Sequence, residues 1–175
     1  YNNGFHSILL LHGGDYQFDY CTVASYGGES TALWLSNFFC YVQDGFNCLV
    51  PSAYRVNARF RNSIFYGSRR DELILEDAIE TPEGFNYQFE NCVVRVTNLL
   101  EEDSFPDFFE NCDNCPQDLT ATTPLFLDTN EDNYRLDSLS IALNLGTPIE
   151  GITTDLEGNQ RDPENPDIGC FERQE

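Results

Sequence analysis

Arginine is the residue of this sequence whose type and spacing could carry polysaccharide chemistry. The chain has no Lys, and six of its nine basic residues fall in one region, at Arg55, Arg59, Arg61, Arg69, Arg70 and Arg95. Elimination from a uronate sugar needs a base near the C5 proton, commonly Lys or Arg, and a cation on the carboxylate. The sequence therefore leaves open the hypothesis that an Arg serves as the base. The cluster can equally neutralise the acidic surface around it or contact a glycan or a partner.

Carboxylate pairs could serve hydrolysis, which needs two acids presented on a common face. With 30 acidic residues in the chain, such pairs arise by chance and indicate little. We assign no catalytic residue and favour a non-catalytic protein. The candidate ligand-binding residues are Arg55, Arg59 and Arg61, together with Trp34, whose flat ring could stack on a sugar face.

The run that begins at Asp128 starts like a calcium loop. Asp128, Asn130 and Asp132 place oxygen ligands at positions 1, 3 and 5. Position 6 is Asn133 instead of Gly, and position 12 is Leu139 instead of Glu, so the match fails where an EF-hand loop is most diagnostic. The pattern favours a structural turn over a weak calcium site, and we assign no cofactor and no metal.

The seven cysteines include one Cys-x-x-Cys motif, Cys112 to Cys115. Zinc would need two further ligands, and a redox motif would need a helix start after it. A local disulfide, or two unpaired thiols, is favoured. His6 and His12 lie six residues apart, which would permit a metal pair on one strand face, but ordinary surface or turn histidines are favoured.

Two aromatic groups exceed what a single coil of chain can bury. The first comprises Trp34, Phe38, Phe39, Tyr41 and Phe46, for which core and loop packing is favoured over a sugar or protein contact. The second belongs to the stretch 97–123, a length of irregular chain that is often functional in a compact domain. Its residues Phe105, Phe108 and Phe109 are the best candidates for a protein–protein contact.

The charge balance limits the classes of partner that the chain can bind. Nine basic and 30 acidic residues give a net charge of −21, which repels nucleic acid and anionic lipid heads. The same charge disfavours a polyanionic glycan unless cations bridge the two. No run approaches 18 apolar residues, so we expect no membrane span. A content of 41% hydrophobic and 14% aromatic residues argues against disorder.

A short internal repeat predicts the architecture that positions these residues. Three segments share one pattern, a Phe followed two residues later by Asn or Tyr and then by Cys or Ser; they begin at Phe18, Phe60 and Phe89. Internal similarity of this kind is typical of stacked repeats. The three Phe rings should stack, Cys21, Ser63 and Cys92 should form a column of small side chains, and Asn62 and Asn91 should lie at a bend with their amides bonding neighbouring coils.

The pattern predicts an all-β fold, a right-handed parallel β-helix of the pectate-lyase type, with coils about 4.8 Å apart. Further strands are expected at 8–11, 32–35 and 72–76. The 42 residues from Phe18 to Phe60 have room for two coils, and the 29 from Phe60 to Phe89 for one coil with an insertion. We expect coils over 1–123, with loops at 42–53 and 97–123, and a capping segment of the same domain over 124–175.

The C-terminal region resembles a known family ending. The elements are Pro124-Leu-Phe-Leu-Asp128, Asn133-Tyr-Arg-Leu136, Ser138–Gly146, Asp155-Leu-Glu-Gly-Asn-Gln-Arg161 and Pro166-Asp-Ile-Gly-Cys-Phe-Glu172. In this order they resemble the choice-of-anchor Q ending of secreted or surface-exposed right-handed β-helix proteins, which are frequent in Bacteroidota. The resemblance covers 124–172 as motif and the preceding coils as fold. It departs at Cys170, where the family usually has Ala, and at the loosely matching Ser140–Asn144.

The resemblance implies an exported protein on the bacterial surface or outer membrane, held by a lipid anchor or by a partner. The family's Asp155, Gly158 and Arg161 look structural, with Asp155 and Arg161 pairing across a turn and Gly158 supplying a positive φ. We expect a structural or recognition subunit of an envelope assembly whose partners are other surface proteins. The alternative is a lyase or hydrolase acting on an acidic glycan, with its active site on coils ahead of Tyr1. An open first coil would otherwise need a covering partner.

Overall fold

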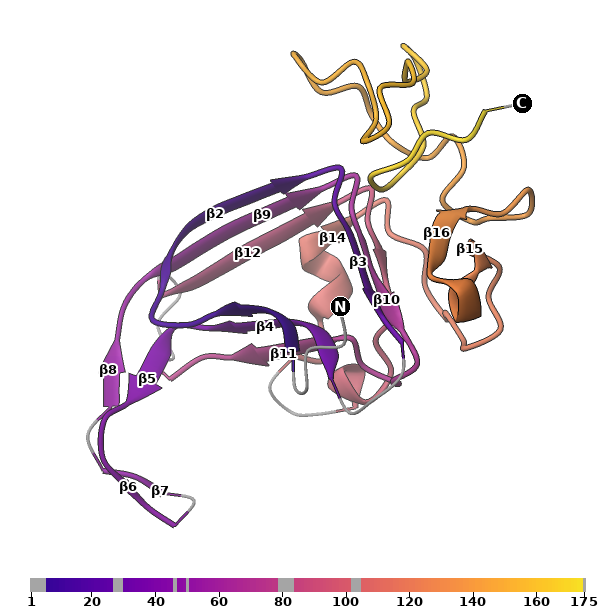
Figure 1. Cartoon of the computed structure of the whole chain (residues 1–175). Coiled ribbons are helices and arrows are strands. Elements are labelled where there is room, and N and C mark those ends of the chain that lie inside the picture. The colour runs from indigo at the N-terminus through magenta and orange to yellow at the C-terminus, as the bar shows by residue number, and fades with distance from the viewer. Residues whose placement is uncertain are drawn as a thin grey trace.

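The computed structural model describes residues 6–26, 30–45, 47–49, 51–78, 84–101 and 105–174. These residues form strands and three short 3-10 helices, with no α-helix among them. Three parallel sheets wind around a common interior, so the chain is an all-β parallel β-helix, as the repeat predicts (Figure 1). No helix in the described part of the chain is long and apolar enough to cross a membrane.

Each coil contributes one strand to each sheet. The first coil contains β1 (His6–Leu10), β2 (Gly14–Asp19) and β3 (Thr22–Ser25). The second contains β4 (Thr31–Ser36), β9 (Val56–Arg61) and β10 (Ile64–Gly67). The third contains β11 (Leu73–Glu76), β12 (Phe85–Glu90) and β13 (Val93–Val94), and β14 (Cys112–Asp113) starts a fourth.

We call these walls sheet A (β1-β4-β11), sheet B (β2-β9-β12-β14) and sheet C (β3-β10-β13). Strands of successive coils lie in matched register, so that Phe18, Phe60 and Phe89 align across sheet B. Their rings stack, with centroids 5.4 Å apart for Phe18 and Phe60 and 4.5 Å apart for Phe60 and Phe89. The predicted aromatic column is confirmed, and it forms the centre of the core.

The corner between sheets B and C repeats one backbone feature. Tyr20, Asn62, Asn91 and Asn114 all have positive φ, between 48° and 53°. The Asn91 Nδ2 donates to Asn62 Oδ1 at 3.2 Å, and Asn114 Nδ2 donates to Asn91 Oδ1 at 2.8 Å. Asn tolerates this left-handed region better than most residues, and its amide can both donate and accept. The predicted Asn ladder is therefore present, and Asn114 extends it by one coil.

The prediction of two coils between Phe18 and Phe60 is wrong. These residues are direct register partners, so the 42 residues that separate the two positions make a single coil. The extra length is an antiparallel extension, with β5 (Phe38–Cys40) paired to β8 (Pro51–Ala53) and β6 (Gln43–Asp44) paired to β7 (Asn47–Cys48). We call residues 38–54 the arm. It projects away from the coils beyond sheets A and B (Figure 1).

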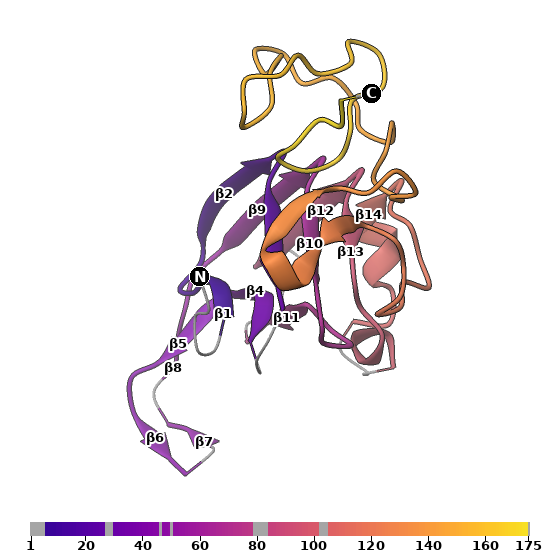
Figure 2. The same ribbon diagram turned by 45° about the vertical axis from the view of Figure 1, so that its right-hand side comes forward.

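The predicted insertion at 97–123 covers one end of the stack. It contains the 3-10 helices η1 (Asn98–Leu100) and η2 (Phe108–Asn111), and η2 lies beside β14, next to the third coil (Figure 2). Phe108 continues the aromatic column, with its centroid 5.5 Å from that of Phe89. Aromatic side chains cover this end because the third coil would otherwise leave its interior open to water.

The C-terminal segment lies along the side of the coils. It contains β15 (Phe126–Asp128), the 3-10 helix η3 (Thr129–Glu131) and β16 (Asn133–Leu136), and an irregular chain follows. Its Leu136 and Ile168 pack on Ile64 and Tyr66 of β10, forming a second core outside sheet C. The segment thus covers an apolar outer face of sheet C, whereas η2 closes the end of the stack (Figure 2).

Candidate functional site

The three candidate arginines lie on β9 and just before it, and each bonds a carboxylate of sheet B. Arg61 makes a two-point contact with Asp19, both distances being 2.7 Å. Arg59 makes a similar contact with Glu90, at 2.8 and 2.9 Å, and Arg55 reaches Asp15 at 3.2 Å. Strand alternation and the matched register place these pairs side by side. The neutralising interpretation of this part of the cluster fits the geometry.

The pair between Arg61 and Asp19 also shows in the pKa values. The hydrogen bonds that Arg61 donates to Asp19 raise the pKa of Arg61. Burial alone would raise the pKa of Asp19, but the hydrogen bonds from Arg61 and Gln17 lower it. A base in an elimination must give up its own proton. Pairing with Asp19 therefore makes Arg61 a worse base than an isolated Arg.

Trp34 does not join the arginines, so the four candidate ligand-binding residues do not form one site. It lies on β4 in sheet A, where its Nε1 donates to Glu76 Oε2 at 2.8 Å. The ring of His6 packs edge-on against it, with centroids 4.8 Å apart. Sheets A and B are different walls of the coil, so residues that lie on them are separated in space even where they are near in sequence. The four candidates, which the sequence named without placing them together, therefore lie on two different walls.

Sheet B carries a shallow polar groove of about 510 Å³. Its lining combines carboxylate, amide and guanidinium groups, from Asp15, Gln17, Asn57, Arg59, Asn86 and Gln88. These groups can exchange hydrogen bonds with hydroxyl-rich ligands. Two of the charges already bond other side chains, Asp15 with Arg55 and Arg59 with Glu90. The groove has the chemistry of a neutral, hydrogen-bonding surface.

Phe108 cannot contact a partner, because its exposed fraction is 0%. Its ring packs against Tyr87 and Phe89 inside the end of the stack. Phe105 and Phe109 are half-buried and pack against the same core. The three residues therefore close the coil interior, which the sequence could not distinguish from a surface patch. The prediction that Phe108 contacts a partner protein is therefore wrong.

Exposed aromatic surface is found instead on the arm. Among the described residues, five of the ten exposed large hydrophobic side chains belong to it: Phe39, Tyr41, Val42, Leu49 and Tyr54. His12 lies among three of these rings, 5.0 Å from Phe39, 5.8 Å from Tyr41 and 5.7 Å from Tyr54. Phe46 lies outside the described residues. The sequence showed this stretch as an aromatic run with a single charge, Asp44, and predicted a loop at 42–53.

The remaining sequence candidates have structural surroundings. Cys112 and Cys115 form a disulfide, one of the two alternatives for that motif. Asp128 caps η3 by accepting from the backbone N–H of Asn130 at 3.0 Å, as a structural turn requires. His6 forms a hydrogen bond with Thr31 in sheet A, whereas His12 packs against Phe39 at the base of the arm. The two histidines therefore have different neighbours. Within the described ranges no three His, Cys, Asp or Glu residues converge as a metal site would need.

The column of small side chains at the B–C corner is confirmed. The backbone N–H of Cys21 donates to Ser63 Oγ at 3.0 Å. Cys92 Sγ lies 3.4 Å from the carbonyl oxygen of Phe60 in the preceding coil. Cys21 and Cys92 are free thiols, and burial raises the pKa of Cys92 to about 12. A thiol with that pKa is not a nucleophile at neutral pH. These residues serve packing.

The expected pair of Asp155 with Arg161 is wrong. Asp155 accepts four hydrogen bonds, from the backbone N–H groups of Glu157, Asn159 and Glu172 and from the Asn159 side chain. Arg161 instead pairs with Glu172 at 3.3 Å and donates to the carbonyl of Gly169 at 2.9 Å. The positive φ of Gly158 is confirmed, at 86°. Asp155 and Arg161 are buried and organise the segment's turns, which agrees with a structural role.

Comparison with known proteins adds no assignment to this geometry. The sequence matches no protein-family model, no curated protein and no solved structure. The function therefore has to be argued from the surfaces that the fold presents.

Proposed function

We propose that this chain is a non-catalytic β-helix subunit that docks onto another protein through the arm. The observation that carries the proposal is the concentration of exposed aromatic and aliphatic side chains on residues 38–54. Exposed apolar surface of this kind is costly in water and marks interaction sites. The resemblance of the C-terminal segment to secreted surface β-helix proteins supports placing that assembly in a bacterial envelope.

Charge supports a protein partner with an apolar, weakly charged groove. The whole chain has a net charge of −21, yet the arm holds one charged residue, Asp44. A second copy would meet the full repulsion of two such charges, whereas an uncharged groove meets none along the arm. Charged residues are depleted and Tyr and Phe are enriched at the cores of protein interfaces. The arm has that composition.

The base of the arm is held in place, which lowers the entropy lost on binding. β5 and β8 pair along three residues each, and Cys40 on β5 is disulfide-bonded. The rings around His12 fix the junction with the first coil. The backbone N–H of Tyr54 donates to the carbonyl of Asn37 at 2.8 Å, which closes the arm where it leaves the coil. A preorganised surface binds more tightly because less freedom has to be given up.

Polysaccharide lyase or hydrolase activity is the competing proposal, and the described surfaces favour it less. The arginines of sheet B are paired with carboxylates, and the pKa of Arg61 is raised by that pairing. The groove on sheet B suits hydroxyl-rich ligands, so glycan recognition without catalysis is compatible with the subunit proposal.

The test is a native pull-down from the envelope with three versions of the protein, followed by binding of the captured protein in pure form. The arm variant Tyr41→Ser/Val42→Ser/Leu49→Ser removes exposed side chains only, and Leu139→Ser/Leu156→Ser removes similarly exposed ones elsewhere. We expect a stoichiometric partner with the natural chain and the control, and loss of it with the arm variant. Equal capture by all three versions, or binding of the arm to neutral phosphatidylcholine vesicles in place of a protein, would refute the proposal.

A further inference from the structure

We propose that a hollow beside β11 binds a small sugar carboxylate, with Arg70 as the residue that recognises the carboxylate. The hollow has a volume of about 480 Å³ and lies where the chain leaves sheet C and enters sheet A, next to η1. Its lining includes Arg69, Arg70, Asp71, Ile74, Asn98 and Leu99. The volume lies within the range of small-molecule sites, roughly 300–1,000 Å³. This site is independent of the arm.

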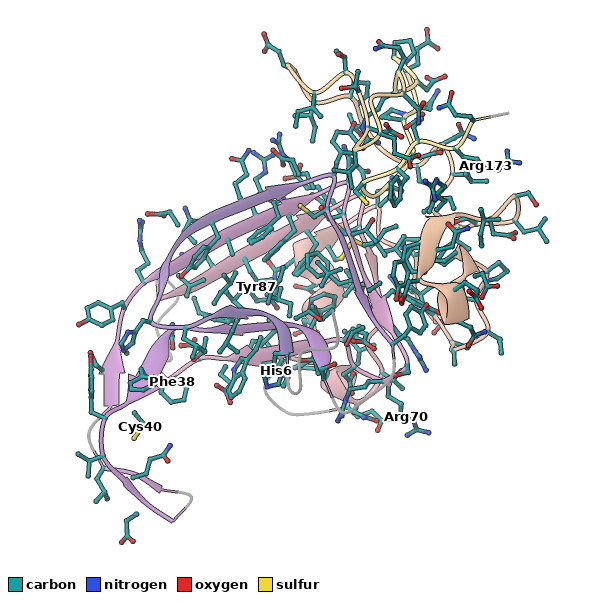
Figure 3. The ribbon with its side chains drawn as sticks, in the orientation of Figure 1. His6, Phe38, Cys40, Arg70, Tyr87 and Arg173 are labelled. Atoms are coloured by element: carbon teal, nitrogen blue, oxygen red, sulfur yellow. A yellow bond between two sulfur atoms is a disulfide. The ribbon has the colours of Figure 1, made fainter. Side chains whose placement is uncertain are left out.

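Two adjacent arginines at one hollow are notable in a chain of net charge −21. Arg70 is exposed, and no hydrogen bond or ion pair within the described residues occupies its guanidinium. It points outward from the corner between β10 and β11 (Figure 3). The arginines of sheet B, by contrast, are held by Asp15, Glu90 and Asp19. Arg70 is therefore available to a ligand without first breaking an ion pair.

The acidic residues next to Arg70 are engaged elsewhere. Asp71 Oδ1 accepts from the backbone N–H groups of Thr97 and Leu99, at 2.7 and 3.1 Å. Glu72 is buried and accepts from the backbone N–H groups of Arg69 and Ala32, at 2.9 and 3.1 Å. Neither carboxylate is placed to satisfy Arg70. The more distant acids are screened at physiological salt, where the Debye length is about 8 Å.

The remaining lining selects the class of anion. The Asn98 side-chain amide makes no hydrogen bond in the described part of the chain, so it can meet a hydroxyl group. Ile74 and Leu99 offer an apolar wall, which suits the C–H face of a sugar ring and has nothing to offer a phosphate. Arg binds a carboxylate through two parallel N–H···O bonds. Together these groups match a hexuronate.

The net charge limits the size of the ligand. A polyanionic chain would cross surface of the same sign as itself, and the repulsion would grow with each added acid. A single carboxylate held at Arg70 meets two arginines and one acid in the hollow, and that acid, Asp71, already accepts from two backbone N–H groups. We therefore assign a monosaccharide, or the acidic end of a longer neutral chain, and exclude a repeating polyuronate.

The test is calorimetric titration at physiological ionic strength, where the distant acids are screened, with glucuronate, galacturonate, glucose and inorganic phosphate as separate titrants. We expect saturable binding of at least one uronate and none of glucose. A hydrogen-bonded charge contributes about 1.5–3 kcal/mol, so Arg70→Ala should weaken uronate binding at least tenfold. Arg135→Ala removes an exposed arginine of the C-terminal segment and should leave uronate binding unchanged.

Three results would overturn the inference. They are no saturation by either uronate, equal uronate affinity of the natural chain and Arg70→Ala, and tighter binding of phosphate than of both uronates. Asn98→Ala is the second variant, because the sugar assignment requires it to weaken uronate binding while leaving phosphate affinity unchanged. Retained thermal melting of each variant shows that a loss of binding is local.

Discussion

The guanidinium of Arg161 lies over the ring of Tyr20, with its central carbon 3.9 Å from the ring centroid. Arg161 belongs to the C-terminal segment and Tyr20 to the first B–C corner, so the contact joins the two ends of the sequence. Tyr20 breaks the Asn ladder, and its hydroxyl donates to the carbonyl of Thr147 at 3.0 Å. The position that departs from the repeat thus still binds the C-terminal segment, as Asn62 and Asn91 of the ladder do through Thr147.

Replacing Arg161 should destabilise the protein strongly. Arg161 is 7% exposed, and its removal would leave Glu172 buried without its cation. Breaking a buried ion pair from one side costs about 3–5 kcal/mol. We expect Arg161→Ala to lower the free energy of unfolding in urea by about that amount. Arg135→Ala, which removes the exposed pair with Glu157, should cost less than about 1 kcal/mol; equal losses for the two variants would contradict this role of Arg161.

Glu72 should make stability depend on pH. Burial raises its pKa from 4.5 to about 7, against the hydrogen bonds from Arg69 and Ala32. A carboxyl whose folded pKa is raised stabilises the fold fully below pH 4.5, and that contribution is lost as the pH rises through about 7. The loss is on the order of 3 kcal/mol.

Glu72→Gln isolates this effect from those acids whose pKa values are lowered and which therefore act in the opposite direction. Asp155 is one, because hydrogen bonds to its carboxylate outweigh its burial and lower its pKa. The difference in unfolding free energy between the natural chain and Glu72→Gln should therefore shift in favour of the variant from pH 4.5 to pH 8. The amide forfeits one acceptor, so its absolute stability starts lower. A difference that stays constant across this range would show that Glu72 keeps an ordinary pKa.

The Asn ladder separates backbone strain from side-chain bonding at one position. Asn91 has a φ of 50°, donates to Asn62 and Thr147, and accepts from Asn114. Asn91→Gly keeps the backbone conformation and loses the hydrogen bonds, at about 1 kcal/mol each. Asn91→Ala loses the same hydrogen bonds and also places a Cβ in the left-handed conformation, which costs a further 1–2 kcal/mol or so. Chemical denaturation should rank natural chain, Gly and Ala in decreasing stability; Ala at or above Gly would exclude backbone strain as a factor.

Phe108 and Phe39 should respond oppositely in stability and binding. Phe108 fills the end of the aromatic column, and truncating a buried Phe costs about 3–5 kcal/mol. Phe39 is 42% exposed on the arm, so Phe39→Ala should leave the melting temperature nearly unchanged. If the arm docks onto a partner, Phe39→Ala should instead weaken that binding. A small loss of stability for Phe108→Ala would mean that η2 does not seal the stack.

Local sequence determined the parts of this protein that depend on neighbouring residues. Alternating side chains around Phe60 predict a strand with one buried face, and Asn62 directly after it predicts a left-handed corner, because both preferences arise within a few residues. Repetition of the pattern at Phe18 and Phe89 then implies stacking. The coil walls, the aromatic column and the ladder all follow from this.

Tertiary structure decided which distant groups meet. The 42 residues between Phe18 and Phe60 fit two coils or one coil with an arm, and only the register of β2 on β9 distinguishes them. Among 30 acids, the partner of Arg161 is chosen by packing, since many carboxylates satisfy the same charge. Phe108 and Phe39 are the same residue type, yet one closes the core and the other faces solvent. Burial depends on what the rest of the chain places against a side chain, and no local pattern contains that information.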